Sequence, residues 1–119
     1  MGSENSRIDK YQYEIHQDID RDRTRDLAFL SLFDRQRKLL CAIAFVPDEQ
    51  ELAQPEESAS GHVAMQMHEK HFARVLDMLR NEKPVYFSWW REAQSMHLST
   101  AKEPVGEQEM RKLFSFLYV

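Results

Sequence analysis

Hydrophobic and polar positions along the chain follow two periods, and each period predicts a different kind of element. In the segment 10–19 (KYQYEIHQDI) hydrophobic and polar residues alternate, which is typical of a strand with one face in solvent. The segments 27–33 and 39–46 are hydrophobic at almost every position, with the short turn DRQR between them. We therefore expect these two segments to form a hairpin of central strands, covered on both faces.

The middle of the chain changes period. From 62 to 68 the residues alternate as in a strand, whereas 69–82 (EKHFARVLDMLRNE) has hydrophobic residues at helical spacing. We expect a strand followed by a helix, and a single long helix from Ser60 is the alternative. Asn81 and Pro84 end the helix in either case.

Two tryptophans stand side by side in the stretch PVYFSWWREAQSMHLST, which predicts a hairpin of strands at 84–90 and 95–101. A turn at 91–94 places Trp89 opposite Met96 on a hydrophobic face. Neighbouring residues of a strand point to opposite faces, so Trp90 lies on the other face, which is partly polar. We expect Trp89 to be in the core, and a register slip of one residue would exchange the two roles.

The end of the chain predicts one further element. Glu107 and Glu109 follow Gly106, and acidic residues favour a helix N-terminus. The segment 107–118 carries hydrophobic residues at helical spacing, so we expect a helix there, with a closing strand as the alternative; these residues are Met110, Leu113, Phe114 and Leu117.

Together these elements predict an α+β fold built on a mainly antiparallel sheet of about six strands with two helices, in the order ββββαββα. Residues 7–119 form a single domain in this interpretation, and residues 1–6 form a disordered tail. The segment 47–60, which has five acidic residues and no basic residue, is expected to be a mobile surface loop or, alternatively, an acidic docking segment.

Composition narrows the class of protein. The chain has 119 residues, the size of one domain, and its net charge of −4 argues against a general nucleic-acid binder. Cys41 is the single cysteine, so no disulfide can form within the chain, and we expect it to be a small buried residue in a reducing compartment. No secretory h-region is present, and the longest hydrophobic run, 39–46, is too short to span a bilayer. We expect a cytoplasmic protein.

The partly polar face of the predicted hairpin is the candidate binding site, and it contains Tyr86, Ser88, Trp90, Ser95 and His97. Rigid aromatics beside small polar residues suit recognition, because they bury a large area and lose little side-chain freedom. The alternative is that the C-terminal helix or the long loop packs on this face, with Trp90 between core and water.

Several chemistries are not supported. The three glycines lie far apart, so a phosphate-binding loop cannot be formed from neighbouring glycines. Ser88 and His97 lack an orienting acid and an oxyanion hole, so we expect no catalytic residues. A zinc protease helix needs a second histidine at position 72, which is Phe72. The segment 18–29 lacks the glycine and glutamate of a calcium loop. We therefore expect neither a metal nor a cofactor.

The resulting hypothesis is a non-catalytic interaction or regulatory module that binds a protein partner or forms a homodimer. The dimer surface is expected at Phe116 and Tyr118, which lie off the hydrophobic stripe of the C-terminal segment. A small-ligand or enzymatic site on the hairpin face is the alternative. Binding of single-stranded nucleic acid is a third hypothesis, which only a few nearby basic residues support.

Overall fold

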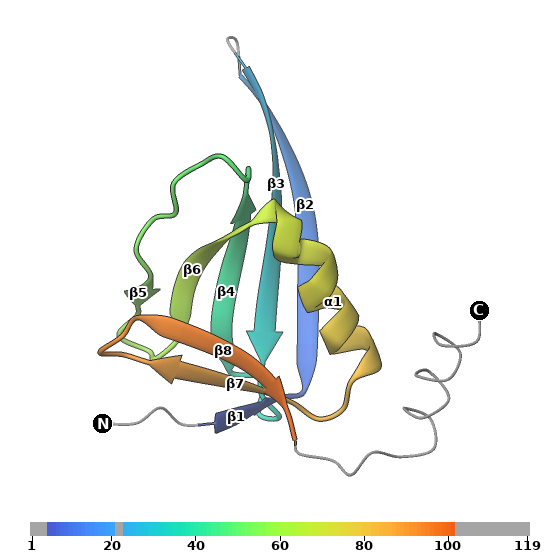
Figure 1. Cartoon of the computed structure of the whole chain (residues 1–119), viewed down its shortest axis with the longest axis vertical. Helices are drawn as coiled ribbons and strands as arrows, with labels where there is room; N and C mark the ends of the chain where they lie inside the picture. The colour runs from blue at the N-terminus through green and yellow to red at the C-terminus, as the bar shows by residue number, and fades with distance from the viewer. Residues whose placement is uncertain (1–4, 21–22, 102–119) are drawn as a thin grey trace, which may run out of the picture.

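The computed structural model describes residues 5–20 and 23–101, which adopt an α+β fold (Figure 1). Within these ranges eight strands form two sheets beside one α-helix. The prediction of about six strands and two helices is therefore wrong, although all six predicted strands are present. The segment 107–118, where the second helix was predicted, lies outside the described residues.

The larger sheet has five strands in the order β2-β3-β4-β6-β5. Strands β2, β3 and β4 form an antiparallel meander, β6 runs parallel to β4, and β5 pairs antiparallel with β6. The β2–β3 hairpin extends well beyond the rest of the sheet (Figure 1). The strand bounds are Lys10–Asp20, Arg23–Phe33, Leu39–Val46, Glu56–Glu57 for β5 and Val63–His68 for β6.

The smaller sheet has three antiparallel strands in the order β1-β7-β8. Its strands are β1 (Asn5–Ile8), β7 (Val85–Trp90) and β8 (Ser95–Thr100). Asn5 and Ser6, which the sequence pattern places in a tail, both lie in β1 and pair with β7. Residues 5–8 thus form an edge strand of this sheet.

One helix connects the two sheets. Strand β6 ends at His68 and is followed by the short 3₁₀ helix η1 (Glu69–His71) and by α1 (Phe72–Asn81). This confirms the expected strand followed by a helix. The Lys70 N–H donates to Asp48 Oδ1 at 2.9 Å, which satisfies one of the backbone donors that a helix start leaves free.

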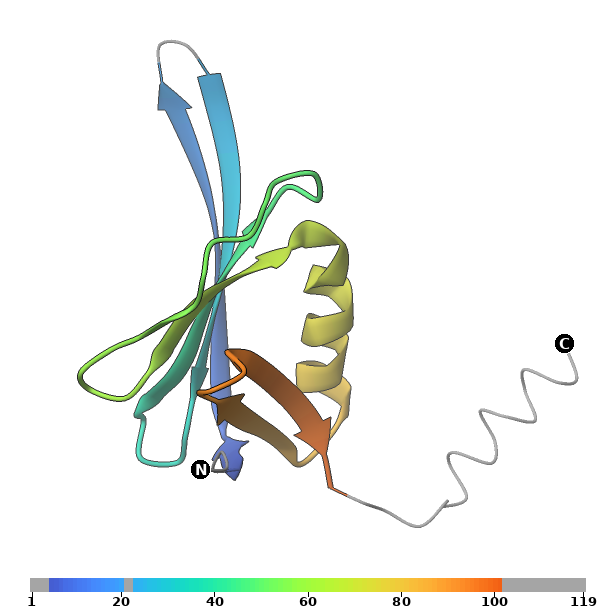
Figure 2. The ribbon, with the colours of Figure 1, turned by 60° about the vertical axis from the view of Figure 1, so that its left-hand side comes forward.

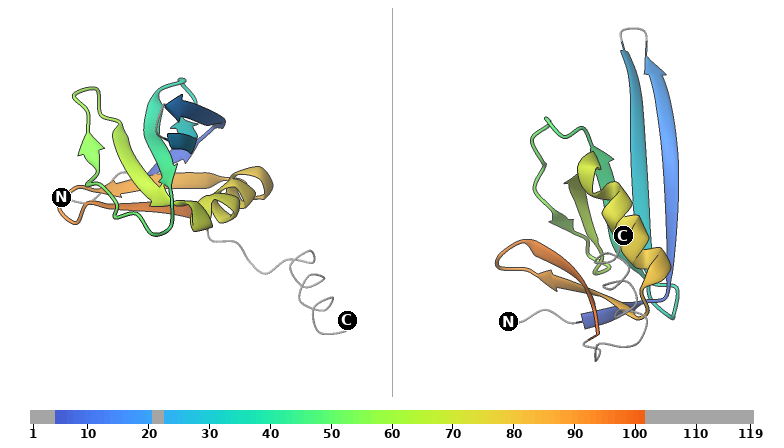
Figure 3. Two further views of the ribbon diagram at one scale, coloured as in Figure 1. Left: turned by 90° about the horizontal axis from the view of Figure 1, so that it is seen from above. Right: turned by 45° about the vertical axis from the view of Figure 1, so that its right-hand side comes forward.

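The hydrophobic core lies between α1, one face of the five-stranded sheet and the inner face of the three-stranded sheet. Leu30, Leu32, Ile43 and Phe45 are almost completely buried in it. Seen from above, α1 and the β7–β8 hairpin lie on the same side of the larger sheet (Figure 3). Phe72 of α1 packs edge-on against Phe45, with ring centroids 4.9 Å apart.

The central strands are covered by α1 on one face only, which corrects the expectation of cover on both faces (Figure 2). On the other face Ser31 pairs with Ala42 and Phe29 pairs with Ala44, and all four residues are half-buried. Half-buried alanines count as hydrophobic in the sequence pattern, so a strand can have an almost continuous run of hydrophobic residues while one of its faces is partly exposed to solvent. In the described part of the chain, no helix has the length and hydrophobicity needed to cross a membrane.

Candidate functional site

The β7–β8 hairpin has the register that the sequence predicts. Trp89 lies opposite Met96, Ser88 opposite His97, and Trp90 opposite Ser95. Trp89 packs against the hydrophobic core, whereas 43% of the Trp90 surface is exposed. The assignment of the two tryptophans to opposite faces is therefore confirmed.

The solvent-facing side of the three-stranded sheet, called the outer face below, combines all five predicted site residues with three more. Strand β1 contributes two of the additional residues, because Asn5 pairs with Ser88 and Arg7 pairs with Tyr86. Sequence reasoning missed them because β1 has a single hydrophobic residue, Ile8, and therefore no alternating pattern. The outer face consists of Asn5, Arg7, Tyr86, Ser88, Trp90, Ser95, His97 and Ser99.

Small polar side chains of the outer face bond to one another. The Ser88 hydroxyl donates to Asn5 Oδ1, and Ser88 is only 5% exposed. A hydrogen bond of 3.0 Å joins Ser95 Oγ and His97 Nε2. The rings of Trp90 and His97 lie 6.5 Å apart at an angle of 58°. Trp90 is therefore an exposed aromatic on a paired strand, with polar side chains nearby that bond to one another.

The same hydrogen bonds are relevant to whether Ser88 and His97 could act together in catalysis. Ser88 and His97 are direct cross-strand neighbours, but the Ser88 hydroxyl bonds to Asn5 and the His97 ring bonds to Ser95. A serine nucleophile needs its hydroxyl hydrogen-bonded to the base. Ser88 and His97 are therefore not arranged as a nucleophile–base pair.

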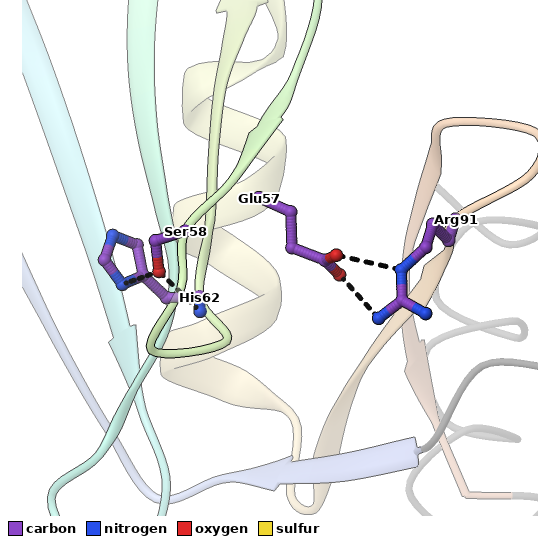
Figure 4. Close-up of polar contacts among 4 residues, drawn as sticks. All are labelled: Glu57, Ser58, His62 and Arg91. Atoms are coloured by element: carbon purple, nitrogen blue, oxygen red, sulfur yellow. Dashed lines mark hydrogen bonds and ion pairs between the residues drawn. The ribbon is translucent and has the colours of Figure 1, made fainter.

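A second serine–histidine contact lies in the turn between β5 and β6 (Figure 4). A hydrogen bond of 2.9 Å joins Ser58 Oγ and His62 Nδ1, and the His62 N–H donates back to Ser58 Oγ at 3.2 Å. Gly61 has a φ of 96° between them, a conformation that glycine adopts without strain. These bonds close a tight local turn, and we assign them a structural role.

An ion pair joins the two sheets (Figure 4). Arg91 in the β7–β8 turn donates from Nε and Nη2 to the two carboxylate oxygens of Glu57 in β5, at 2.8 and 3.0 Å. The hydrogen bond from Arg91 is the main cause that lowers the pKa of Glu57. The Trp89 indole also lowers it, although Trp89 Nε1 is buried and makes no hydrogen bond of normal geometry with any described residue. The ion pair fixes the hairpin end that carries Trp90.

Four of the histidines are dispersed over the fold. His62 lies in the β5–β6 turn, His68 bonds to Gln50 O at 2.8 Å, His71 belongs to η1, and His97 is on β8. Among the side chains that the structure describes, no group of three or more histidine, cysteine, aspartate or glutamate residues could hold a metal ion.

Two hollows in the surface lie away from the predicted site residues. One, of about 280 Å³, lies where the end of α1 meets β1 and β7, and Arg7, Arg80 and Lys83 are among its lining residues. The other, of about 240 Å³, lies between α1 and β8. Neither of these two hollows is lined by any of the five predicted site residues.

Comparisons of this chain with protein-family models, with curated proteins and with solved structures found no match. Phe116 and Tyr118, the residues predicted for a dimer surface, lie outside the described residues.

Proposed function

We propose that this chain is a non-catalytic interaction module that binds a protein partner through the outer face of the three-stranded sheet. The observation that carries the proposal is the 43% exposure of Trp90 on a regular strand, beside small side chains that already bond to one another. Large aromatics that stay exposed on a rigid element are typical anchors of protein interfaces.

The energetic reason is pre-organisation. Trp90 is carried by a paired strand, and the hairpin end next to it is fixed by the bond between Arg91 and Glu57. Binding then needs little additional ordering of the backbone, and more of the interaction energy remains as affinity. The hydroxyl, amide and imidazole groups around Trp90 supply the polar contacts that a protein surface needs at the rim of an interface.

The shape and charge of the outer face favour a protein over other ligands. Small-molecule sites are concave, whereas Arg7 alone of the eight outer-face residues lines either of the two hollows described above. Stacking platforms for single-stranded nucleic acid need a basic surround. Arg7 is the one lysine or arginine among the eight outer-face residues.

The test compares two exposed hydrophobic residues of similar exposure. The wild-type protein, Trp90→Ala and Leu52→Ala are used as bait in the source cells, and the captured proteins are identified by mass spectrometry. Leu52 is 41% exposed and lies in the loop before β5, so it is a matched control for non-specific hydrophobic capture. We expect one partner that is captured by the wild type and by Leu52→Ala but not by Trp90→Ala.

The purified partner then gives a quantitative test. Removing an aromatic anchor typically costs about 2 kcal/mol or more of binding free energy, roughly a 30-fold loss in affinity. We expect this loss for Trp90→Ala in calorimetric titration, and little change for Leu52→Ala. Equal affinity of all three proteins would refute the assignment of the outer face.

A further inference from the structure

A hydrophobic groove lies on the opposite side of the three-stranded sheet from Trp90. It runs between α1 and β8 and has a volume of about 240 Å³. Val75 is buried, and the other hydrophobic lining residues are only partly buried. The groove is lined by the hydrophobic residues Met67, Val75, Met78, Met96 and Leu98 and by the basic residues His71 and Arg74.

Two properties of the groove indicate that it receives a peptide segment. Three of its lining residues are methionines, whose flexible side chains adapt to the shape of a bound hydrophobic group. Strand β8 also pairs only with β7 within the described residues, so its far edge has no strand partner in this part of the chain. Open hydrophobic area beside an unpaired edge strand is usually covered in a stable protein.

We propose that the groove binds the C-terminal segment of the same chain, residues 107–118. The stripe of hydrophobic residues in this segment would face the groove; it comprises Met110, Leu113, Phe114 and Leu117. A stripe at helical spacing needs a hydrophobic surface to pack against. The groove supplies such a surface, and β8, which forms one of its walls, ends shortly before the segment in the sequence.

The length of the connection supports this occupant. Leu98 of the groove stands three residues before Ala101, the last described residue, and Met110 stands nine residues after it. Nine residues span up to about 30 Å when extended, which is enough for the segment to turn back onto β8. A short tether also keeps the local concentration of the segment high, so that weak contacts suffice for docking.

The charges of the segment and of the groove also support this occupant. Glu107 and Glu109 directly precede the hydrophobic stripe, while His71 and Arg74 line the groove. Carboxylates at the start of the segment would lie near these basic side chains when the stripe is docked. The inference is independent of the proposed function, because Met96 and Leu98 face the core side of β8 and Trp90 faces the outer side.

Methionine methyl NMR on the full chain tests the proposal directly. Met67, Met78 and Met96 report on the groove, Met110 reports on the segment, and each signal is assigned by a single Met→Leu substitution. We expect a nuclear Overhauser contact between the Met110 methyl group and at least one groove methyl group. In a sample of equal parts labelled and unlabelled protein, we expect no such contact in the isotope-filtered spectrum, because the contact is made within one chain.

Substitutions in the segment provide the second readout. Leu113→Asp with Phe114→Asp should shift the three groove methyl signals, whereas Ser115→Asp, which lies off the stripe, should leave them unchanged. The nuclear Overhauser contact of Met110 in the wild type tests the proposal even if the double variant unfolds. Wild-type spectra without a contact from Met110 to the groove would overturn the proposal. A contact seen only between chains would also overturn it, because a second copy would then supply the segment.

Discussion

Glu57 and Arg91 stand 34 residues apart in the chain and form a two-point ion pair that joins β5 to the β7–β8 turn. Each nitrogen of the fork bonds a different carboxylate oxygen, which fixes orientation as well as distance. The pair is therefore a constraint on how the three-stranded sheet sits beside the larger one, and it positions the hairpin end next to Trp90.

The first prediction concerns the pH dependence of this ion pair. Arg91 lowers the pKa of Glu57, so the pair stabilises the fold above the ordinary glutamate pKa of about 4.3 and stops doing so as the pH falls through the lowered folded value. Glu57→Gln should therefore be less stable than the wild type at pH 7, and the difference should shrink towards pH 3. Urea unfolding at both pH values measures it. Glu56→Gln, at the neighbouring exposed glutamate, is the control, and an equal pH response in both variants would contradict the prediction.

The second prediction compares the two tryptophans. Trp89 packs on the core and is partly buried, so Trp89→Ala should lose about 3 kcal/mol of unfolding free energy, the lower end of the range for aromatic truncation. Trp90→Ala should lose clearly less, because Trp90 is exposed on the outer face. Urea unfolding of the two variants decides between them. Similar losses would mean that Trp90 also stabilises the fold.

Local periodicity explains which parts of this fold the sequence predicts. The β7–β8 register follows from the alternation of hydrophobic and polar residues on two strands joined by a short turn. The change from strand to helix near His68 follows from a change of period from two to 3.6 residues. In both cases the burial of one face decides the structure, and burial leaves a pattern in the sequence.

The parts that the sequence missed leave no such pattern. Strand β5 consists of Glu56 and Glu57, which are both exposed, so no buried face marks it in the sequence. The start of β3 at Arg23 lies in a run of charged residues that resembles a solvated turn. The division into two sheets and the pair of Glu57 with Arg91 depend on contacts distant in sequence, which one sequence cannot reveal.

The third prediction concerns Cys41, which is fully buried in β4. Burial raises the pKa of its thiol to about 12, so the thiol stays protonated and shielded at pH 8. We expect no reaction with a disulfide reagent such as DTNB in the folded protein and complete reaction of one thiol per chain in urea. Rapid labelling of the native protein at pH 8 would show that β4 opens readily.

The same thiol should make stability depend on pH in the alkaline range. In the unfolded chain it ionises above about pH 8.5, whereas in the folded chain it stays neutral to a higher pH. The thiol therefore contributes a loss of stability as the pH rises above about 8.5. Cys41→Ala should lack this contribution. The free energy of unfolding of the wild type should therefore fall relative to that of Cys41→Ala between pH 8 and pH 10.

The last prediction is that the chain forms a homodimer through Phe116 and Tyr118. If the neighbouring hydrophobic stripe packs within the chain, these two aromatics face outward, and pairing with a second copy removes them from water. Burial contributes roughly 25 cal/mol per Å² of hydrophobic area, and two-fold pairing places each patch against its own copy. We expect a dimer at micromolar concentration that Phe116→Asp with Tyr118→Asp converts into a folded monomer. Sedimentation measures the state of assembly, and circular dichroism measures folding. A wild type that sediments as a monomer at high concentration would exclude the dimer, and a double variant that unfolds would place both aromatics in the core of a single chain.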